Sequence, residues 1–118
     1  MEYLLLAYTP EPVWPELTTD QREQKFFAAY GAYVEALNKA GVVKGMHRLR
    51  PTGDATTVRV SEGKQQVLDG PYADSKEQLG GYFLIDVPDL DAALSWAARC
   101  PAAEHGVVEV RPIWVMQP

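Results

Sequence analysis

The sequence predicts an α+β fold of the ferredoxin-like, or split βαβ, class, with an inserted β-hairpin and with two chains packed as a dimeric α+β barrel. Three observations support this prediction. The expected elements run strand, helix, strand, hairpin, strand, helix, strand along the chain. Two helices can cover only one face of a four-stranded sheet, yet two expected strands are apolar on both faces. The length of 118 residues fits one domain, residues 1–118.

The chain is expected to open with a strand that is followed by the clearest helix. Residues 2–8, EYLLLAY, form a continuous apolar run typical of a strand covered on both faces. The helix is expected over residues 20–41. Asp20 with Glu23 three residues later resembles a capping box, and Gly41 can end the helix in a left-handed conformation.

Apolar side chains recur along this helix at helical spacing, and we interpret them as core. They are Phe26, Phe27, Tyr30, Tyr33, Val34 and Leu37. Gly31 lies inside the helix, where glycine costs about 1 kcal/mol relative to alanine. Its presence hints at a close approach by another backbone.

The remaining elements are expected over residues 42–49 (strand), 56–60 with 65–69 (hairpin), 81–87 (strand), 90–100 (helix) and 107–116 (strand). Gly45 predicts a bulge in the first of these strands. Asp89 is placed to cap the second helix, which Pro101 ends. The single cysteine, Cys100, is expected to be a small buried residue and excludes an internal disulfide.

Two strands of the expected sheet carry apolar residues on both faces, namely Leu4, Leu5 and Leu6 in one strand and Phe83, Leu84 and Ile85 in the other. Helices on one side leave the other side uncovered, and a large exposed apolar patch usually marks an interface. We therefore expect a homodimer that packs sheet to sheet through the open face, with a cleft between the sheets.

Charge and composition exclude several classes of function. A net charge of -5 and scattered lysines and arginines argue against direct nucleic-acid binding. No apolar run reaches the roughly 20 residues of a membrane span, and the start of the chain lacks a signal peptide, so we expect a cytoplasmic protein. Two distant histidines and one cysteine show no metal-ligand spacing, and no motif implies a cofactor.

Residues 67–83 form a longer connection than a hairpin needs. The Asp-Gly-Pro run at 69–71 predicts a rigid turn, because glycine permits positive φ and proline fixes φ. Ser75 with Gln78 fits a capping box for one helical turn over residues 75–79. These features predict a preorganised loop and leave open whether the loop is only structural or holds a site.

Around this loop the sequence resembles a known family. Residues 68–103 and 106–112 look like the signature of the DGPF subgroup of the YCII-related proteins, named for Asp-Gly-Pro-Phe followed by an acidic turn with Lys-Glu and by Gly-Gly. This chain has Tyr72 in place of the phenylalanine, and Asp74 and Ser75 where the pattern commonly has Glu-Thr. The resemblance covers nearly the full length.

The resemblance implies a ferredoxin-like fold that dimerises through its sheet, similar in architecture to muconolactone isomerase and cofactor-free monooxygenases. It suggests a cofactor-independent enzyme that acts on a small organic molecule. Some members are proposed to use a His-Asp pair with the histidine on the first helix, but residues 20–40 contain no histidine. DGPF members are often linked with extracytoplasmic-function sigma factors. The alternative is therefore a non-catalytic ligand-binding or regulatory homodimer associated with such a factor.

Asp69 is the leading candidate for a general base or a substrate-binding carboxylate in the pocket. It could equally accept hydrogen bonds from the amides of its own turn, and both interpretations stay open. His47 is the best proton-transfer partner for Asp69, because the unperturbed pKa of histidine is about 6.5. A lone histidine on a strand is nevertheless more often structural or exposed.

Three further residues are weaker candidates for ligand binding. Tyr72 would line the pocket or simply pack, and Lys76 would contact a ligand or form an ion pair at the surface. Arg111 shares a strand face with Glu109, so the two side chains are expected to pair there or across the dimer. Alternatively, the Arg111 guanidinium could bind an anionic ligand, since it matches carboxylate geometry.

Overall fold

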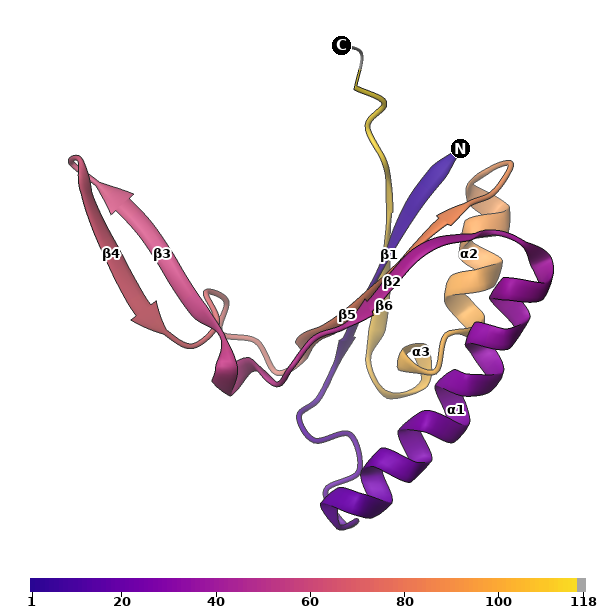
Figure 1. The fold of residues 1–118 in the computed structure, drawn as a ribbon, viewed down its shortest axis with the longest axis horizontal. Coiled ribbons are helices and arrows are strands. Elements are labelled where there is room, and N and C mark those ends of the chain that lie inside the picture. Colours follow the sequence, from indigo (N-terminus) through magenta and orange to yellow (C-terminus); the bar gives the residue numbers. More distant parts are fainter. Residues whose placement is uncertain (117–118) are drawn as a thin grey trace.

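The computed structural model describes residues 1–116 and contains a four-stranded antiparallel sheet with helices on one side (Figure 1). The strands are, in sheet order, β2 (Val43–Arg48), β5 (Gln78–Asp86), β1 (Glu2–Thr9) and β6 (Val107–Pro112). The helices are α1 (Thr19–Ala40), α2 (Leu90–Arg99) and the short α3 (Ala102–His105). The predicted mixed α+β class with antiparallel sheets is confirmed, and the strand order is that of a split βαβ fold.

The core lies between the helices and the inner face of the sheet. Leu5 of β1, Ile85 of β5 and Leu37 of α1 are fully buried there. Small side chains on α2, among them Ala93, complete the cluster, and Cys100 is buried as expected. Every second residue of β1 from Tyr3 to Ala7 is buried, so one face of this central strand points into the core.

The opposite face of the sheet is apolar at its centre. Cross-strand partners share a face, and the register of β1 with β5 places Leu4 beside Leu84 and Leu6 beside Tyr82. These side chains are only partly buried, while α1 and α2 both lie on the other side of the sheet (Figure 1). We refer to this surface as the open face. Its cover by a second copy of the chain stays a prediction.

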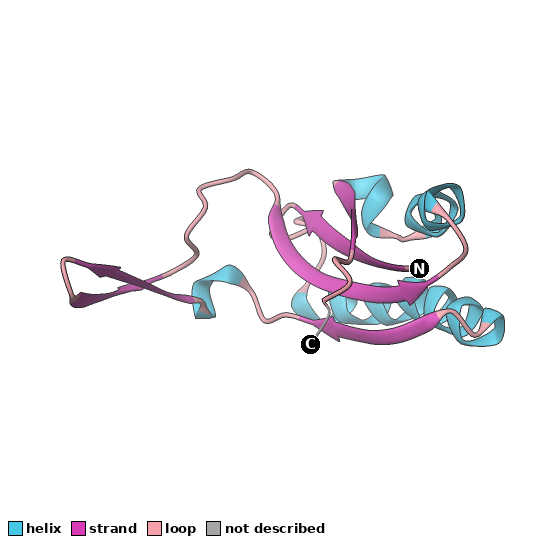
Figure 2. Ribbon diagram, turned by 90° about the horizontal axis from the view of Figure 1, so that it is seen from above, coloured by secondary structure: helices cyan, strands magenta, loops and turns pink. Residues whose placement is uncertain are grey.

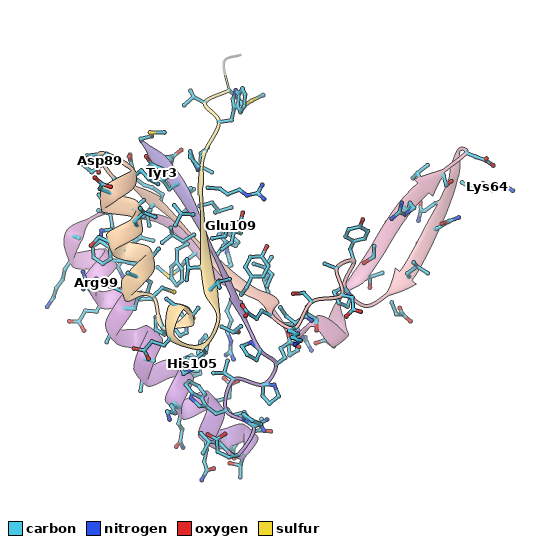
Figure 3. All side chains as sticks on the ribbon, turned by 180° about the vertical axis from the view of Figure 1, so that it is seen from behind. Tyr3, Lys64, Asp89, Arg99, His105 and Glu109 are labelled. Atoms are coloured by element: carbon cyan, nitrogen blue, oxygen red, sulfur yellow. The ribbon has the colours of Figure 1, made fainter. Side chains whose placement is uncertain are left out.

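Between β2 and β5 the chain leaves the sheet and forms a separate two-stranded hairpin (Figures 1 and 2). Its strands are β3 (Thr56–Ser61) and β4 (Lys64–Asp69), preceded by the 3-10 helix η1 (Thr52–Asp54). Positive φ angles of 52° at Glu62 and 76° at Gly63 are typical of a type I′ turn. We refer to residues 56–69 as the arm. Its strand residues are all exposed except Thr57, and Lys64 lies near the tip, far from the body (Figure 3).

Helix α1 is capped two residues earlier than expected. Thr18 is the N-cap: its Oγ1 accepts from the Gln21 amide at 3.2 Å, and the Gln21 side chain accepts from the Thr18 amide at 3.0 Å. The expected box of Asp20 and Glu23 is wrong, because Thr18 already satisfies the free amides and Glu23 pairs with an arginine of the sheet. Gly41 ends the helix at φ 69°, as expected.

Two local features in the rest of the chain follow the prediction, whereas the last strand, expected over residues 107–116, ends at Pro112. Asp89 caps α2, with its Oδ1 accepting from the Ala92 amide at 2.9 Å. The register of β2 with β5 shifts between Val43 and Gly45, which confirms the expected bulge. Among the helices of the described residues, none combines the length and the apolar character needed to cross a membrane.

Candidate small-molecule site

Arg48 occupies a fixed position where β2 ends and α1 passes over the sheet. It lies opposite Gly81 of β5, and its guanidinium stacks over the ring of Phe26 at 3.7 Å from the centroid. Two of its N–H groups donate to the two carboxylate oxygens of Glu23, at 2.8 and 2.9 Å. These hydrogen bonds raise the pKa of Arg48 and lower the pKa of Glu23. The result is a bidentate ion pair held against an aromatic ring.

An apolar cavity of about 350 Å³ lies between α1 and the edge of the sheet, next to this pair. Its lining is mostly aromatic and aliphatic, and includes Phe26, Phe27, Tyr30, Val34, Met46 and Phe83. Tyr30 stacks on Phe26 with 4.4 Å between the ring centroids. Burial raises the pKa of the Tyr30 phenol well above its usual range, so this hydroxyl stays protonated at neutral pH. We refer to this space as the inner cavity.

Gly31 keeps the inner cavity open. A Cβ placed on Gly31 would find no atom of the described chain within 4 Å. The expected close approach by another backbone is therefore wrong within this chain. The missing side chain instead leaves free space in the wall that α1 contributes to the cavity. A helix-destabilising residue at this position is thus explained by a cavity and not by tight packing.

A second, more polar cavity of about 650 Å³ lies on the other side of Arg48. It is enclosed by the loop at residues 10–14, the first turns of α1 and the chain that follows β2. Arg22 holds this loop, because its Nε donates to the Trp14 carbonyl at 2.8 Å and a terminal nitrogen donates to the Pro15 carbonyl at 3.2 Å. We refer to this space as the outer cavity. It shares Thr9, Phe26, Arg48 and Gly80 with the inner cavity, so the two spaces adjoin at the ion pair.

His47 and Arg111 lie on the open face, and His47 also lines the inner cavity. The Nδ1 of His47 is 2.7 Å from the hydroxyl oxygen of Tyr82, and Arg111 pairs with Glu109 as expected. Their strands, β2 and β6, are the two edges of the sheet, so three strand spacings, about 14 Å, separate them. One chain therefore does not bring these two candidates together.

Asp69 lies at the end of β4, where the arm returns to the body, and its side chain is exposed. It lines neither the inner nor the outer cavity. Within residues 1–116 its carboxylate takes part in no hydrogen bond. The turn is held by other groups: the Gly70 amide donates to the Ala55 carbonyl at 2.7 Å, and the Thr57 hydroxyl donates to the Gly70 carbonyl at 2.8 Å. Asp69 is thus free of a structural role in its own turn.

The segment after Asp69 lacks the expected helical turn at residues 75–79. Ser75 does accept a hydrogen bond from the Glu77 amide at 3.3 Å, but Gln78 already belongs to β5. The prediction was wrong because β5 extends to pair with the end of β1, opposite Thr9, and a single helical turn cannot compete with strand pairing.

Tyr72 and Lys76 both belong to this segment and are exposed. Tyr72 is 77% exposed, and the Arg59 guanidinium of the arm lies 5.8 Å from its ring centroid. Neither residue lines the two cavities described above. In one chain, therefore, Asp69, Tyr72 and Lys76 all lie outside the two cavities.

The ferredoxin-like sheet and the adjoining cavities define an α+β protein with a small-molecule-sized pocket. The YCII-related domain matches residues 1–117, so the chain belongs to the YCII-related family. An uncharacterised protein of Rhizobium meliloti (strain 1021) is 40% identical over 123 aligned positions, which span 100% of this chain and 96% of that protein. Membership of the DGPF subgroup stays a prediction.

A solved structure with the same fold is 5-chloro-2-hydroxyhydroquinone dehydrochlorinase from Burkholderia phenoliruptrix, in complex with 2,5-dihydroxybenzoquinone. The TM-score is 0.54, the sequence identity is 16%, and the match covers 97% of this chain and 94% of that chain. At this identity the likeness shows the fold alone.

Sequence reasoning missed the pairing of Arg48 with Glu23 and with Phe26. The sequence did not single out Arg48 as a candidate, and Glu23 was assigned to the helix cap. These residues meet only after α1 packs on the sheet, so no local pattern could reveal them. The usable signal was Gly31, a glycine within an aromatic helix, which marks the inner cavity.

Proposed function

We propose that this YCII-related protein is a cofactor-independent enzyme that acts on a small ring compound bound in the joined cavities beside Arg48. The observation that carries the proposal is the position of Arg48, which lines both an aromatic cavity and a polar one. Small-molecule sites usually enclose about 300–1,000 Å³, are mostly apolar and contain a few well-placed polar groups. The inner cavity, at about 350 Å³, falls within this range.

The chemistry of the lining favours a planar ring with a hydroxyl or carbonyl oxygen. Aromatic walls favour stacked or edge-on rings. An arginine has five N–H donors, and Arg48 uses two of them on Glu23, so donors remain for a ligand oxygen. Because Glu23 already balances the charge of Arg48, a phosphate would gain little from this site. The dehydrochlorinase that shares the fold was solved with a hydroxylated benzoquinone, a ligand of the class proposed here.

Asp69 remains the proposed general base of this enzyme. Its carboxylate is exposed and makes no hydrogen bond within the described residues, so it is available to a ligand. In one chain it lies outside both cavities. We assign its delivery to a second copy in a homodimer that forms through the open face, at the edge strand β2, where His47 lines the inner cavity. His47 stays the proposed partner for proton transfer, with Tyr82 as its hydrogen-bonding neighbour.

A thermal-shift screen tests the proposal, using hydroxylated benzoquinones, catechols and hydroxybenzoates, with phenyl phosphate as a charged comparison. At least one hydroxyl- or carbonyl-bearing ring should raise the melting temperature and then be consumed in an absorbance assay. Arg48→Gln should abolish the shift. Arg99→Gln is the matched control, because the Arg99 guanidinium also stacks on a ring, that of Trp96 at 4.3 Å, but lines neither cavity.

The screen has two other informative outcomes. If a ring compound binds through Arg48 but is not consumed, the enzyme hypothesis is wrong and the non-catalytic ligand-binding alternative takes its place. Tighter binding of phenyl phosphate than of any hydroxylated ring would contradict the proposed class of ligand, because it would require an unbalanced positive charge at Arg48.

A further inference from the structure

The arm has one apolar face that nothing within the described chain covers. Side chains alternate along a strand and cross-strand partners share a face. The register of β3 with β4 therefore places six side chains on one face: Thr56, Val58, Val60, Gln65, Val67 and Asp69. We refer to this surface as the valine face. Its three valines are 58%, 67% and 54% exposed, in chain order.

An arm of this kind is not expected to stand alone in water. A single two-stranded hairpin is marginally stable at best and needs a further strand or a packing partner. The arm forms its own sheet, separate from the sheet of the body, and projects away from the helices (Figures 1 and 2). Its exposed apolar face therefore points to a partner that packs against it.

The overall dimensions indicate how much surface such a partner would cover. The radius of gyration is 16.3 Å, whereas a compact chain of this length should have about 13.5 Å. The accessible surface is 8391 Å², whereas a compact monomer of this mass should expose about 6,400 Å². The excess of about 2,000 Å² exceeds the roughly 800 Å² per partner that a standard stable interface buries.

A second copy of the same chain is the partner that these surfaces fit. The valine face and the open face are both apolar, and the arm projects on the side of the sheet that is opposite the helices (Figure 1). A two-fold axis repeats every contact, so two copies that meet through their open faces also place each arm within reach of the other body. One interface then covers both apolar surfaces of both chains.

We infer that the arm is a dimerisation arm: its valine face packs against the second copy and encloses Asp69 between the two chains. Asp69 lies on the valine face at the base of the arm, opposite Thr56. Packing that face against a partner removes the Asp69 carboxylate from bulk water without using it in the fold of its own chain. The significance of Asp69 as a base rests on the proposed function, but the existence of the interface does not.

The first experiment measures self-association of the full chain by sedimentation equilibrium. Val58→Ser combined with Val67→Ser removes one cross-strand pair of the valine face. The matched control combines Arg59→Ser with Gln66→Ser, the next pair along the hairpin, on its other face. The wild type should be a dimer, the valine variant should raise the dimer dissociation constant at least tenfold, and the control should change it by less than twofold.

The inference is overturned by a wild-type monomer, by a dimer that survives the valine substitutions, or by equal weakening in both variants. Circular dichroism of each variant confirms that the body is folded, which is expected because the arm forms a separate sheet. No ligand enters this experiment. A dimer that forms as expected but binds no ring compound would therefore refute the proposed function, but it would not contradict the inference that the arm mediates dimerisation.

The second experiment measures the enclosure of Asp69 directly. The natural cysteine, Cys100, is 1% exposed, so an introduced cysteine is the only one that a thiol reagent reaches quickly. Asp69→Cys should react at least tenfold more slowly than Gln66→Cys at high protein concentration, and the difference should vanish on dilution to monomer. Equal rates at high concentration, or protection that does not depend on concentration, would overturn the enclosure between copies.

Discussion

The guanidinium carbon of Arg48 lies 3.7 Å from the centroid of the Phe26 ring. Phe26 belongs to α1 and Arg48 to the edge strand β2, so this contact ties the helix to the sheet. The same contact places a cation at the junction of the inner and outer cavities. The candidate site is thus built by the packing of the body, and its stability and its chemistry depend on the same few residues.

Glu23→Gln should make the stability less sensitive to acid. Arg48 lowers the pKa of Glu23 below the ordinary 4.5, so ionisation of Glu23 stabilises the folded state above that pH. The contribution is lost as the pH falls through the lower folded-state pKa. Both side chains are nearly half exposed, at 46% and 44%, so water screens the pair and the effect should be at most about 0.5 kcal/mol. Urea unfolding of the wild type and of Glu23→Gln at pH 7 and pH 3 checks this. A stability difference between the two proteins that is larger at pH 3 than at pH 7 would contradict the prediction.

Gly81→Ala should destabilise the protein by at least about 2 kcal/mol, in the range of an overpacked core. A Cβ on Gly81 would meet the His47 carbonyl oxygen at 2.8 Å, and neither backbone can move without breaking the pairing of β2 with β5. Gly80→Ala is the control, because its nearest neighbour, the Thr9 hydroxyl, would lie 3.9 Å away. Denaturant melts compare the two variants. Equal stabilities would show that the strands are not held this closely.

Thr18→Ala should reduce the free energy of unfolding by about 1 kcal/mol, the usual effect of losing an N-cap. The side chain of Thr18 accepts the Gln21 amide, which alanine cannot replace. Thr19→Ala offers the same chemical change one residue later, where the side chain caps nothing, and should be nearly neutral. If the two variants are equally stable, helix α1 starts elsewhere.

Asp69→Asn should abolish turnover of any substrate found for the protein while leaving the melting temperature nearly unchanged. The reason is that the turn is held by Gly70 and Thr57, not by the carboxylate of Asp69. Asp54→Asn, which removes an exposed ion pair with Arg50, serves as the control and should retain activity. A large decrease in the melting temperature of Asp69→Asn would instead indicate that Asp69 has a purely structural role.

Most of the fold could be predicted from the sequence because its signals are local. The periods of the apolar residues identified the strands and helices, and Gly41 and Asp89 identified two helix ends. The errors occurred where two local solutions compete. The N-cap of α1 is Thr18 and not Asp20 as expected. Strand pairing of β5 replaces the helical turn that was expected at Ser75.

The candidate site could not be predicted in the same way, because its parts meet only in three dimensions. The recognisable loop drew attention to Asp69, while the cavities lie beside Arg48 and Asp69 lines neither of them. Gly31 carried the one local signal of the inner cavity, and it was interpreted as a sign of close packing. A glycine in a helix indicates missing volume, and only the surrounding structure shows whether a backbone or a ligand uses it.

The most direct test of the proposed site is the affinity of Gly31→Leu for the ring compound that stabilises the wild type in the screen, measured by isothermal titration calorimetry. A leucine at this position of the wall would take up part of the inner cavity, so the affinity should fall at least tenfold. Ala32→Leu adds a leucine to the next residue of α1, which is exposed and lines neither cavity, and should bind as the wild type does. Wild-type affinity in Gly31→Leu would contradict the account, because the ligand would then bind elsewhere.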